Sequence, residues 1–158
     1  MPQPYAIRTI AHGSAAYAAE LALRKKVLRD PLGLEFTQEE LRTDARSIHL
    51  GCFQDDRLLG CLVLTPGAGG DVRMRQVAVL PELQGRGIGT ALVTTAEALA
   101  REKGFRRMVL HARQSAVPFY QRLGYRTVGE PFTEVGLPHR QMEKALAHAC
   151  NVAYRDRR

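Results

Sequence analysis

The stretch Gln84-Gly85-Arg86-Gly87-Ile88-Gly89 lies between a short apolar run, residues 77–80, and a segment with the pattern of an amphipathic helix from Thr90. Its glycines, at alternate positions, leave the backbone N–H groups without shielding side chains. The helix that follows adds further unpaired N–H groups and the positive end of its dipole. This combination predicts a phosphate or pyrophosphate site, although glycine clusters also form ordinary turns.

Two familiar glycine motifs do not fit this stretch. A P-loop requires Gly-Lys before Ser or Thr, and the chain contains no Gly-Lys dipeptide. A dinucleotide-binding fingerprint requires a third glycine where Thr90 stands. The pattern that fits is Gln-x-x-Gly-x-Gly, formed by Gln84, Gly87 and Gly89 behind a predicted strand.

A second motif follows downstream, where Ala116, Phe119, Tyr120, Gly124 and Tyr125 fit Ala-x-x-Phe-Tyr-x-x-x-Gly-Tyr. With both motifs in this order, the chain resembles the GNAT superfamily of N-acetyltransferases from about residue 7 to residue 144. Residues 27–34 and 133–139 are similar to the ElaA-like subgroup of that superfamily.

The resemblance implies acetyl-CoA as the acetyl donor, coenzyme A as the product and no metal. The pantetheine arm would pair with the strand before the glycine loop, and Tyr120 would protonate the leaving thiolate. The residues assigned to cofactor binding are Val77, Ala78, Val79, Gln84, Gly85, Arg86, Gly87, Ile88, Gly89 and Thr90. As alternatives, the valines are ordinary core residues and Tyr120 is a packed aromatic.

The general base is where the sequence departs from the family pattern. Many members carry Glu or His where Arg73 and Arg75 stand, and arginine stays protonated at neutral pH. A water chain, His111, Glu134 or His139 could replace that base. Strand alternation puts both arginines on the face of residue 77, where they would favour acidic or zwitterionic acceptors. As an alternative, both reach past the sheet edge to solvent or pair with glutamates. Residues 28–37 are further candidate acceptor contacts, or a loop with one packed phenylalanine.

The resemblance therefore predicts an enzyme that transfers an acetyl group to a primary amine of a small molecule or peptide, by direct attack in a ternary complex. The alternative is a catalytically silent acyl-CoA-binding sensor. A nucleic-acid-binding protein rests on the net charge of +7 alone, because the basic residues are scattered along the chain. We therefore expect no nucleic-acid partner.

The composition predicts one ordinary globular domain over residues 1–145, followed by a basic tail at 146–158. No apolar run reaches the length of a membrane span, and residues 1–20 lack the core of a secretory signal. Three cysteines without metal-ligand spacing read as reduced thiols in a cytoplasmic protein. A homodimer is one assembly that the sequence leaves open.

Hydrophobic periodicity and caps predict the order β–α–α–β–β–β–α–β–α–β–β. This order predicts a mixed α/β (α+β) fold, with a central sheet flanked by helices, and it matches the mostly antiparallel GNAT fold. Among the details, Ser14 and Ser115 are expected to cap helices, and Thr37 with Glu40 has the pattern of a capping box. The first helix is expected to have an apolar face at residues 21, 24, 27 and 28, residues 58–65 are a nearly continuous apolar run, and Gly124 is expected to end its helix in the left-handed conformation. Residues 131–138 are expected to form a long connection before a last strand at 140–145.

Overall fold

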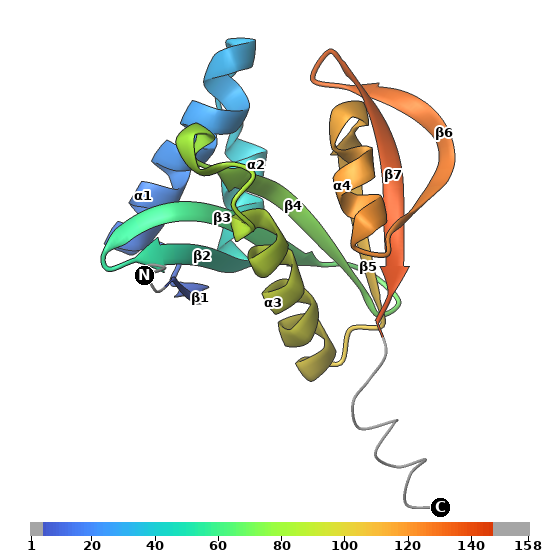
Figure 1. Ribbon diagram of the computed structural model, residues 1–158, viewed down its shortest axis with the longest axis horizontal. Coiled ribbons are helices and arrows are strands. Elements are labelled where there is room, and N and C mark those ends of the chain that lie inside the picture. Colours follow the sequence, from blue (N-terminus) through green and yellow to red (C-terminus); the bar gives the residue numbers. More distant parts are fainter. Residues whose placement is uncertain (1–4, 147–158) are drawn as a thin grey trace, which may run out of the picture. The chain divides into compact units, whose positions relative to one another are not determined.

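The computed structural model describes residues 5–146, and its element order confirms the predicted one (Figure 1). The predicted tail lies outside the described residues except for Leu146. The strands are β1 (Ala6–Ile10), β2 (Ile48–Gln54), β3 (Arg57–Pro66), β4 (Asp71–Val79), β5 (Arg107–Arg113), β6 (Arg126–Glu134) and β7 (Leu137–Ala145). The α-helices are α1 (Ala15–Arg24), α2 (Gln38–Ala45), α3 (Ile88–Glu102) and α4 (Val117–Arg122).

The strands form one seven-stranded sheet in the order β1-β2-β3-β4-β5-β7-β6. The pairs β1–β2, β2–β3, β5–β7 and β6–β7 are antiparallel, whereas β4 pairs with β5 in parallel. The predicted mixed, mostly antiparallel sheet with flanking helices is therefore confirmed.

Two compact units make up the chain. Among the described residues, the first contains residues 5–65 and 74–96, and the second contains residues 66–73 and 97–146. Strand β4 contributes to both, because its residues 71–73 pair with β5 inside the second unit. The single domain over residues 1–145 remains a prediction.

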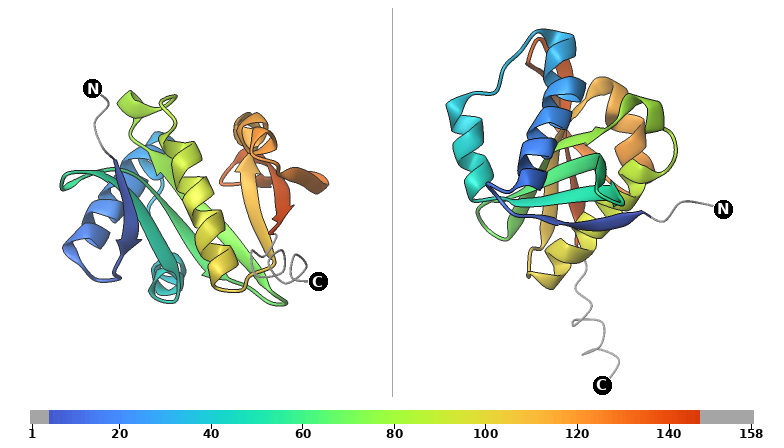
Figure 2. Two further views of the ribbon diagram at one scale, coloured as in Figure 1. Left: turned by 60° about the horizontal axis from the view of Figure 1, so that its bottom comes forward. Right: turned by 90° about the vertical axis from the view of Figure 1, so that its left-hand side faces the viewer.

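The core of the first unit is built around β3. Every residue of this strand from 58 to 65 is buried, which explains its nearly continuous apolar sequence. Helices α1 and α2 lie on one face of β1–β3 and α3 lies on the other (Figure 2). Gly60 allows the close approach of α3, since a Cβ there would lie 3.1 Å from Leu92 Cδ1 and 3.2 Å from Ile88 Cγ2.

Local capping signals fix the two helices on the first face. The Ser14 side chain accepts a hydrogen bond from the Tyr17 amide at the start of α1, as predicted. Thr37 and Glu40 form the predicted capping box at the start of α2. Between the two helices the chain makes a π-helical turn over Lys25–Arg29 and a 3₁₀ turn over Asp30–Leu32.

The structure of the second unit corrects two sequence expectations, and the first concerns residues 131–138. Residues 131–138 are not a long connection, because β6 runs to Glu134 and β7 begins at Leu137. Pro131 lies on an edge strand at a register shift, where no ladder N–H is needed. The turn at Val135-Gly136 has positive φ at both residues, 47° and 76°, which suits a tight hairpin.

The start of α4 is the other correction. Ser115 lies inside a 3₁₀ turn, Gln114–Ala116, and α4 begins at Val117 without a side-chain cap. The predicted left-handed glycine at the end of this helix is present, since Gly124 has a φ of 95°.

Candidate active site

The glycine loop of the first unit offers a run of unpaired amides. Between Gln84, whose amide donates to Pro81 O, and Ala91, whose amide donates to Gly87 O, the amides of residues 85–90 have no backbone acceptor in the described part of the chain. Gly85 and Gly87 have φ values of 81° and 86°, and a Cβ at either position would meet no atom within 4 Å. Six amides beside open space at a helix start form an arrangement suited to an anion.

The strand before this loop carries a local irregularity. Gln76 has a φ of 55°, in the left-handed region that non-glycine residues seldom adopt. After it, Ala78 is buried while Val77 and Val79 stay half-buried. The Gln84 side chain donates to Val79 O at 3.1 Å, so this motif residue holds the loop against the end of β4. Arg86 is exposed at the tip.

Tyr120 lies in the second unit, on α4. It is 7% exposed and packs edge-on against Phe119 and Tyr125, with ring centroids 5.0 and 5.7 Å away. Burial raises the pKa of the Tyr120 hydroxyl, so the group stays protonated and can donate at neutral pH. The Tyr125 hydroxyl donates instead to buried Glu97 at 2.8 Å.

Four residues singled out in the sequence come together in the second unit. His111 Nδ1 lies 3.0 Å from Glu134 Oε1 and 3.1 Å from Arg73 Nη2. His139 Nε2 lies 3.7 Å from Glu134 Oε2, and its Nδ1 bonds Leu137 O at 2.9 Å. The Phe132 ring contacts both imidazoles. We call Arg73, His111, Glu134 and His139 the β5–β7 cluster.

Arg75 belongs to a different network. Its Nε donates to Thr65 Oγ1 at 2.9 Å and its Nη2 donates to Asp44 Oδ1 at 2.6 Å. Asp44 therefore balances the charge of Arg75, whereas Arg73 bonds His111.

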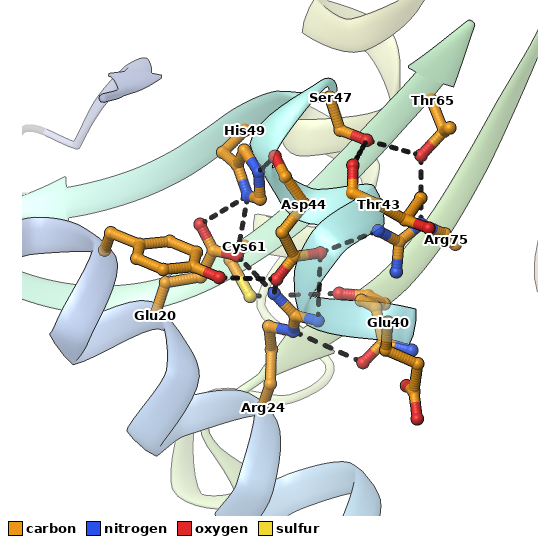
Figure 3. Close-up of polar contacts among 12 residues, drawn as sticks. Glu20, Arg24, Glu40, Thr43, Asp44, Ser47, His49, Cys61, Thr65 and Arg75 are labelled. Atoms are coloured by element: carbon orange, nitrogen blue, oxygen red, sulfur yellow. Dashed lines mark hydrogen bonds and ion pairs between the residues drawn. The ribbon is translucent and has the colours of Figure 1, made fainter. Parts of the chain in front are cut away.

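A buried polar network surrounds this ion pair in the first unit (Figure 3). Asp44, with no exposed surface, accepts from Tyr17 Oη at 2.7 Å, from Arg24 Nη1 at 2.8 Å and from Arg75. Arg24 also donates to Glu20 at 2.7 Å. Burial alone would raise the pKa of Asp44, but the hydrogen bonds from Arg24 and Tyr17 outweigh it and hold the pKa below its usual range.

His49 completes the network through both ring nitrogens. Nδ1 lies 2.8 Å from Glu20 Oε2, and Nε2 lies 2.8 Å from the Asp44 backbone oxygen, which can only accept. Burial alone would lower the pKa of His49, but the Glu20 hydrogen bond outweighs it and the pKa lies above its ordinary value. Satisfying both contacts therefore requires a proton on each nitrogen, or a proton on Glu20.

This raised pKa predicts a pH dependence of stability. A raised native pKa contributes stability that is fully present below the unfolded value of about 6.5 and is lost as pH rises through the native value. We expect the free energy of unfolding to fall from pH 6 towards pH 9 more steeply in the native chain than in His49→Gln. Urea denaturation across this range measures the difference, and equal slopes would contradict the prediction.

Local sequence patterns do not predict this network. The buried face of α1 was expected at residues 21, 24, 27 and 28 as an apolar face, whereas the side chains buried deepest on it include Tyr17, Glu20 and Arg24. The available signal was the Glu20–Arg24 pair at the i, i+4 spacing, on the same face as Tyr17. That pattern is also typical of exposed helix surfaces.

Other features of the described residues bear on the chemistry. Within residues 5–146, no group of three or more His, Cys, Asp or Glu side chains is arranged to hold a metal ion. None of the helices there is both long and apolar enough to cross a membrane. Cys52 and Cys61 are buried free thiols, and burial raises the pKa of each; Cys150 lies outside the described residues.

Comparisons with known proteins agree on one family. The family model described as "Acetyltransferase (GNAT) family" matches residues 16–125. The Bacillus subtilis protein YyaT is 32% identical over 79 residues, which are 50% of this chain and 53% of YyaT. The chain spans about half the length of the first curated relatives: the matches cover 53%, 49% and 52% of those three proteins.

Solved structures share the fold over nearly the whole chain. A Lactobacillus plantarum protein superposes with a TM-score of 0.81 at 29% identity, covering 90% of this chain and 99% of the other. Escherichia coli ElaA superposes with a TM-score of 0.76 at 20% identity, and the match covers 89% of this chain and 98% of ElaA. A GNAT family acetyltransferase from Elizabethkingia anophelis with acetyl-CoA bound superposes with a TM-score of 0.70 at 19% identity. That match covers 90% of this chain and 98% of the other.

Proposed function

This chain belongs to the GNAT family of acetyltransferases, and on that basis we propose that it transfers an acetyl group from acetyl-CoA to a primary amine. The acceptor is a small molecule or peptide, and the amine attacks the thioester directly while both substrates are bound. Buried, reduced Cys52 and Cys61 suit a reducing compartment, so we propose that the reaction takes place in the cytoplasm.

The observation that carries this proposal is the loop at residues 84–90. Its six amides without backbone acceptors and its two left-handed glycines suit a pyrophosphate, which needs several donors converging on one space. The exposed Arg86 adds a cation at the same loop. Half-buried Val77 and Val79 lie on the strand that the family uses for the pantetheine arm, and we assign that role to residues 77–79.

Each bond change in the reaction has an assigned group. The amine nitrogen forms the new C–N bond, the C–S bond breaks, and the sulfur leaves as a thiolate. We assign the proton for that thiolate to the Tyr120 hydroxyl, which burial keeps protonated. The acceptor must itself lose a proton, because an ammonium group has no lone pair with which to attack.

A sensor that binds acyl-CoA without turnover is the competing function, and a two-part experiment separates it from the enzyme. Calorimetry with acetyl-CoA measures binding. A thiol-release assay with glutamate, a Gly-Ala dipeptide, spermidine, benzylamine and kanamycin as acceptors measures turnover. We expect both signals. Binding without thiol release from any acceptor would favour the sensor, and absence of binding would reject both functions.

Gly87→Val is expected to weaken acetyl-CoA binding at least tenfold, or about 1.4 kcal/mol. The branched side chain would stand in the open space beside the unpaired amides, where a Cβ meets nothing within 4 Å. Gly104→Val is the matched control, because Gly104 has a similar φ of 88°, meets nothing within 4 Å and follows the far end of α3. Calorimetry on both variants checks the prediction, and equal affinities would contradict it.

The charge of Arg73 predicts a preference among acceptors. We expect amines that carry a carboxylate or phosphate to be better acceptors than spermidine, since Asp44 already balances Arg75 while Arg73 has no carboxylate bonded to it in the described residues. Arg73→Met should narrow the gap in kcat/KM, whereas Arg42→Met, at an exposed site on α2, should not. A better rate with spermidine in the native chain would contradict this preference.

A further inference from the structure

Within the proposed acetyl transfer, we propose that His111 is the general base that deprotonates the acceptor's ammonium group, and that Glu134 is the positioning residue that selects its active tautomer. The β5–β7 cluster carries this inference. It places one imidazole nitrogen between a guanidinium and a carboxylate.

The two neighbours of His111 Nδ1 make opposite demands on it. The Arg73 guanidinium, 3.1 Å away, can only donate a hydrogen bond, so it requires a lone pair on Nδ1. The Glu134 carboxylate, 3.0 Å away, can only accept when ionised, so it requires a proton on Nδ1. A neutral imidazole can satisfy only one of these two hydrogen bonds at a time. Whether Nδ1 carries the proton then decides whether Nε2 carries one.

Only one of these two states can act as a base. When Nδ1 carries the proton and donates to Glu134, Nε2 has a free lone pair and can accept a proton from an ammonium group. When Nδ1 accepts from Arg73, Nε2 carries the proton and has nothing to accept with. Glu134 therefore favours the competent tautomer, and Arg73 favours the incompetent one.

Nε2 of His111 is placed to meet a substrate. The His111 side chain is 30% exposed, and Nε2 forms no hydrogen bond with any of residues 5–146. The Phe132 ring stands edge-on at 5.1 Å between ring centroids and covers part of the imidazole. This combination leaves Nε2 without a partner in the described residues and places an aromatic ring beside the imidazole.

The other candidates in the cluster are less suited to the role. His139 has a side chain only 5% exposed, its Nδ1 is bonded to Leu137 O, and its Nε2 faces Glu134. Arg73 cannot accept a proton at neutral pH. Glu134 is 40% exposed and its carboxylate lies against both histidines, so it acts on the acceptor through His111.

The proton inventory closes without any further reactant. The ammonium nitrogen loses two protons on the way to the amide. The first moves to Nε2 before the amine lone pair forms the C–N bond, and the new imidazolium keeps its Nδ1–H bonded to the Glu134 carboxylate. The second leaves the nitrogen as the C–S bond breaks, and it replaces the proton that Tyr120 gives to the thiolate. After the product leaves, Nε2 returns the proton to water.

The tautomer can be read without any substrate. In ¹⁵N NMR of the full chain, we expect His111 to carry its proton on Nδ1 at pH 8. Glu134→Ala should move it to Nε2, because Arg73 is then the remaining partner, and Arg73→Met should strengthen the Nδ1–H form. A native chain with Nε2–H, or a tautomer that ignores Glu134, would overturn the positioning role.

Turnover tests the base itself, with acetyl-CoA and the best acceptor of the amine panel. His111→Gln should lower kcat/KM by about 10²-fold or more and remove the rising limb of its pH profile. Glu134→Ala should lower kcat, and Glu134→Gln should recover part of the loss, since its amide oxygen can accept from Nδ1–H. Glu130→Ala, at an exposed site on the same strand, is the control and should leave both kcat and the pH profile of kcat/KM unchanged.

The outcomes separate this inference from the function beneath it. Transfer by the native chain together with an unchanged pH profile in His111→Gln would overturn the base and leave the acetyltransferase standing. A native chain that acetylates none of the amines would overturn both. The predicted loss in His111→Gln with unchanged acetyl-CoA affinity would support both.

Discussion

Asp44→Asn is expected to lower the free energy of unfolding by about 3–5 kcal/mol, the usual cost of removing one partner from a buried ion pair. Asp44 has no exposed surface and accepts from Tyr17, Arg24 and Arg75. Asparagine keeps the shape, but it removes the charge that balances two arginines and turns one oxygen into a donor. Urea denaturation followed by circular dichroism measures the loss.

Asp30→Asn is the matched control for this experiment. Asp30 also forms an ion pair, with Lys25 at 2.8 Å, but its side chain is 54% exposed. Exposed pairs contribute little, because water screens both charges. We expect a small change for Asp30→Asn, and similar losses in the two variants would show that burial is not what makes Asp44 important.

Tyr120→Phe is expected to lower kcat by about 10²-fold or more while acetyl-CoA affinity changes little. Phenylalanine keeps the ring that packs against Phe119 and Tyr125 and removes only the hydroxyl. If that hydroxyl protonates the thiolate, its loss affects the chemical step and leaves binding intact. Stopped-flow thiol release and calorimetry measure the two quantities separately.

Tyr125→Phe provides the contrast. Its hydroxyl donates to Glu97, which also receives Lys144 at 2.9 Å, so we expect this variant to lose stability more than turnover. Native-like turnover in Tyr120→Phe would remove Tyr120 from the mechanism and leave it as a packed aromatic of α4.

Hydrophobic periodicity and helix-capping patterns predict most of the secondary-structure elements of the fold. The capping box at Thr37, the apolar run of β3 and the glycine at position 124 each depend on neighbours close in sequence, so a local pattern was enough to predict them. Residues 131–138 have the local pattern of a connection, because proline in a single sequence is equally compatible with a loop and with an edge strand. The loop at 84–90 was found for the same local reason.

The two polar assemblies could not be found in this way. The Asp44 network joins residues from α1, α2, β2 and β4, and the β5–β7 cluster joins four strands. Sequence reasoning named the members of the cluster as separate candidates, but only the register of β5, β6 and β7 shows that they meet. Long-range pairing decides both, and spacing along the chain does not encode it.

The two-residue turn at Val135-Gly136 limits how this lineage can change in length. Hairpin tips commonly absorb insertions. Here an added residue that moved β6 against β7 by one position would turn Glu134 away from His111, because side chains alternate between the faces of a sheet. Because both turn residues have positive φ, the tip constrains residue type as well as length, and a change in either can move a carboxylate that lies two strands from the sheet's parallel pair.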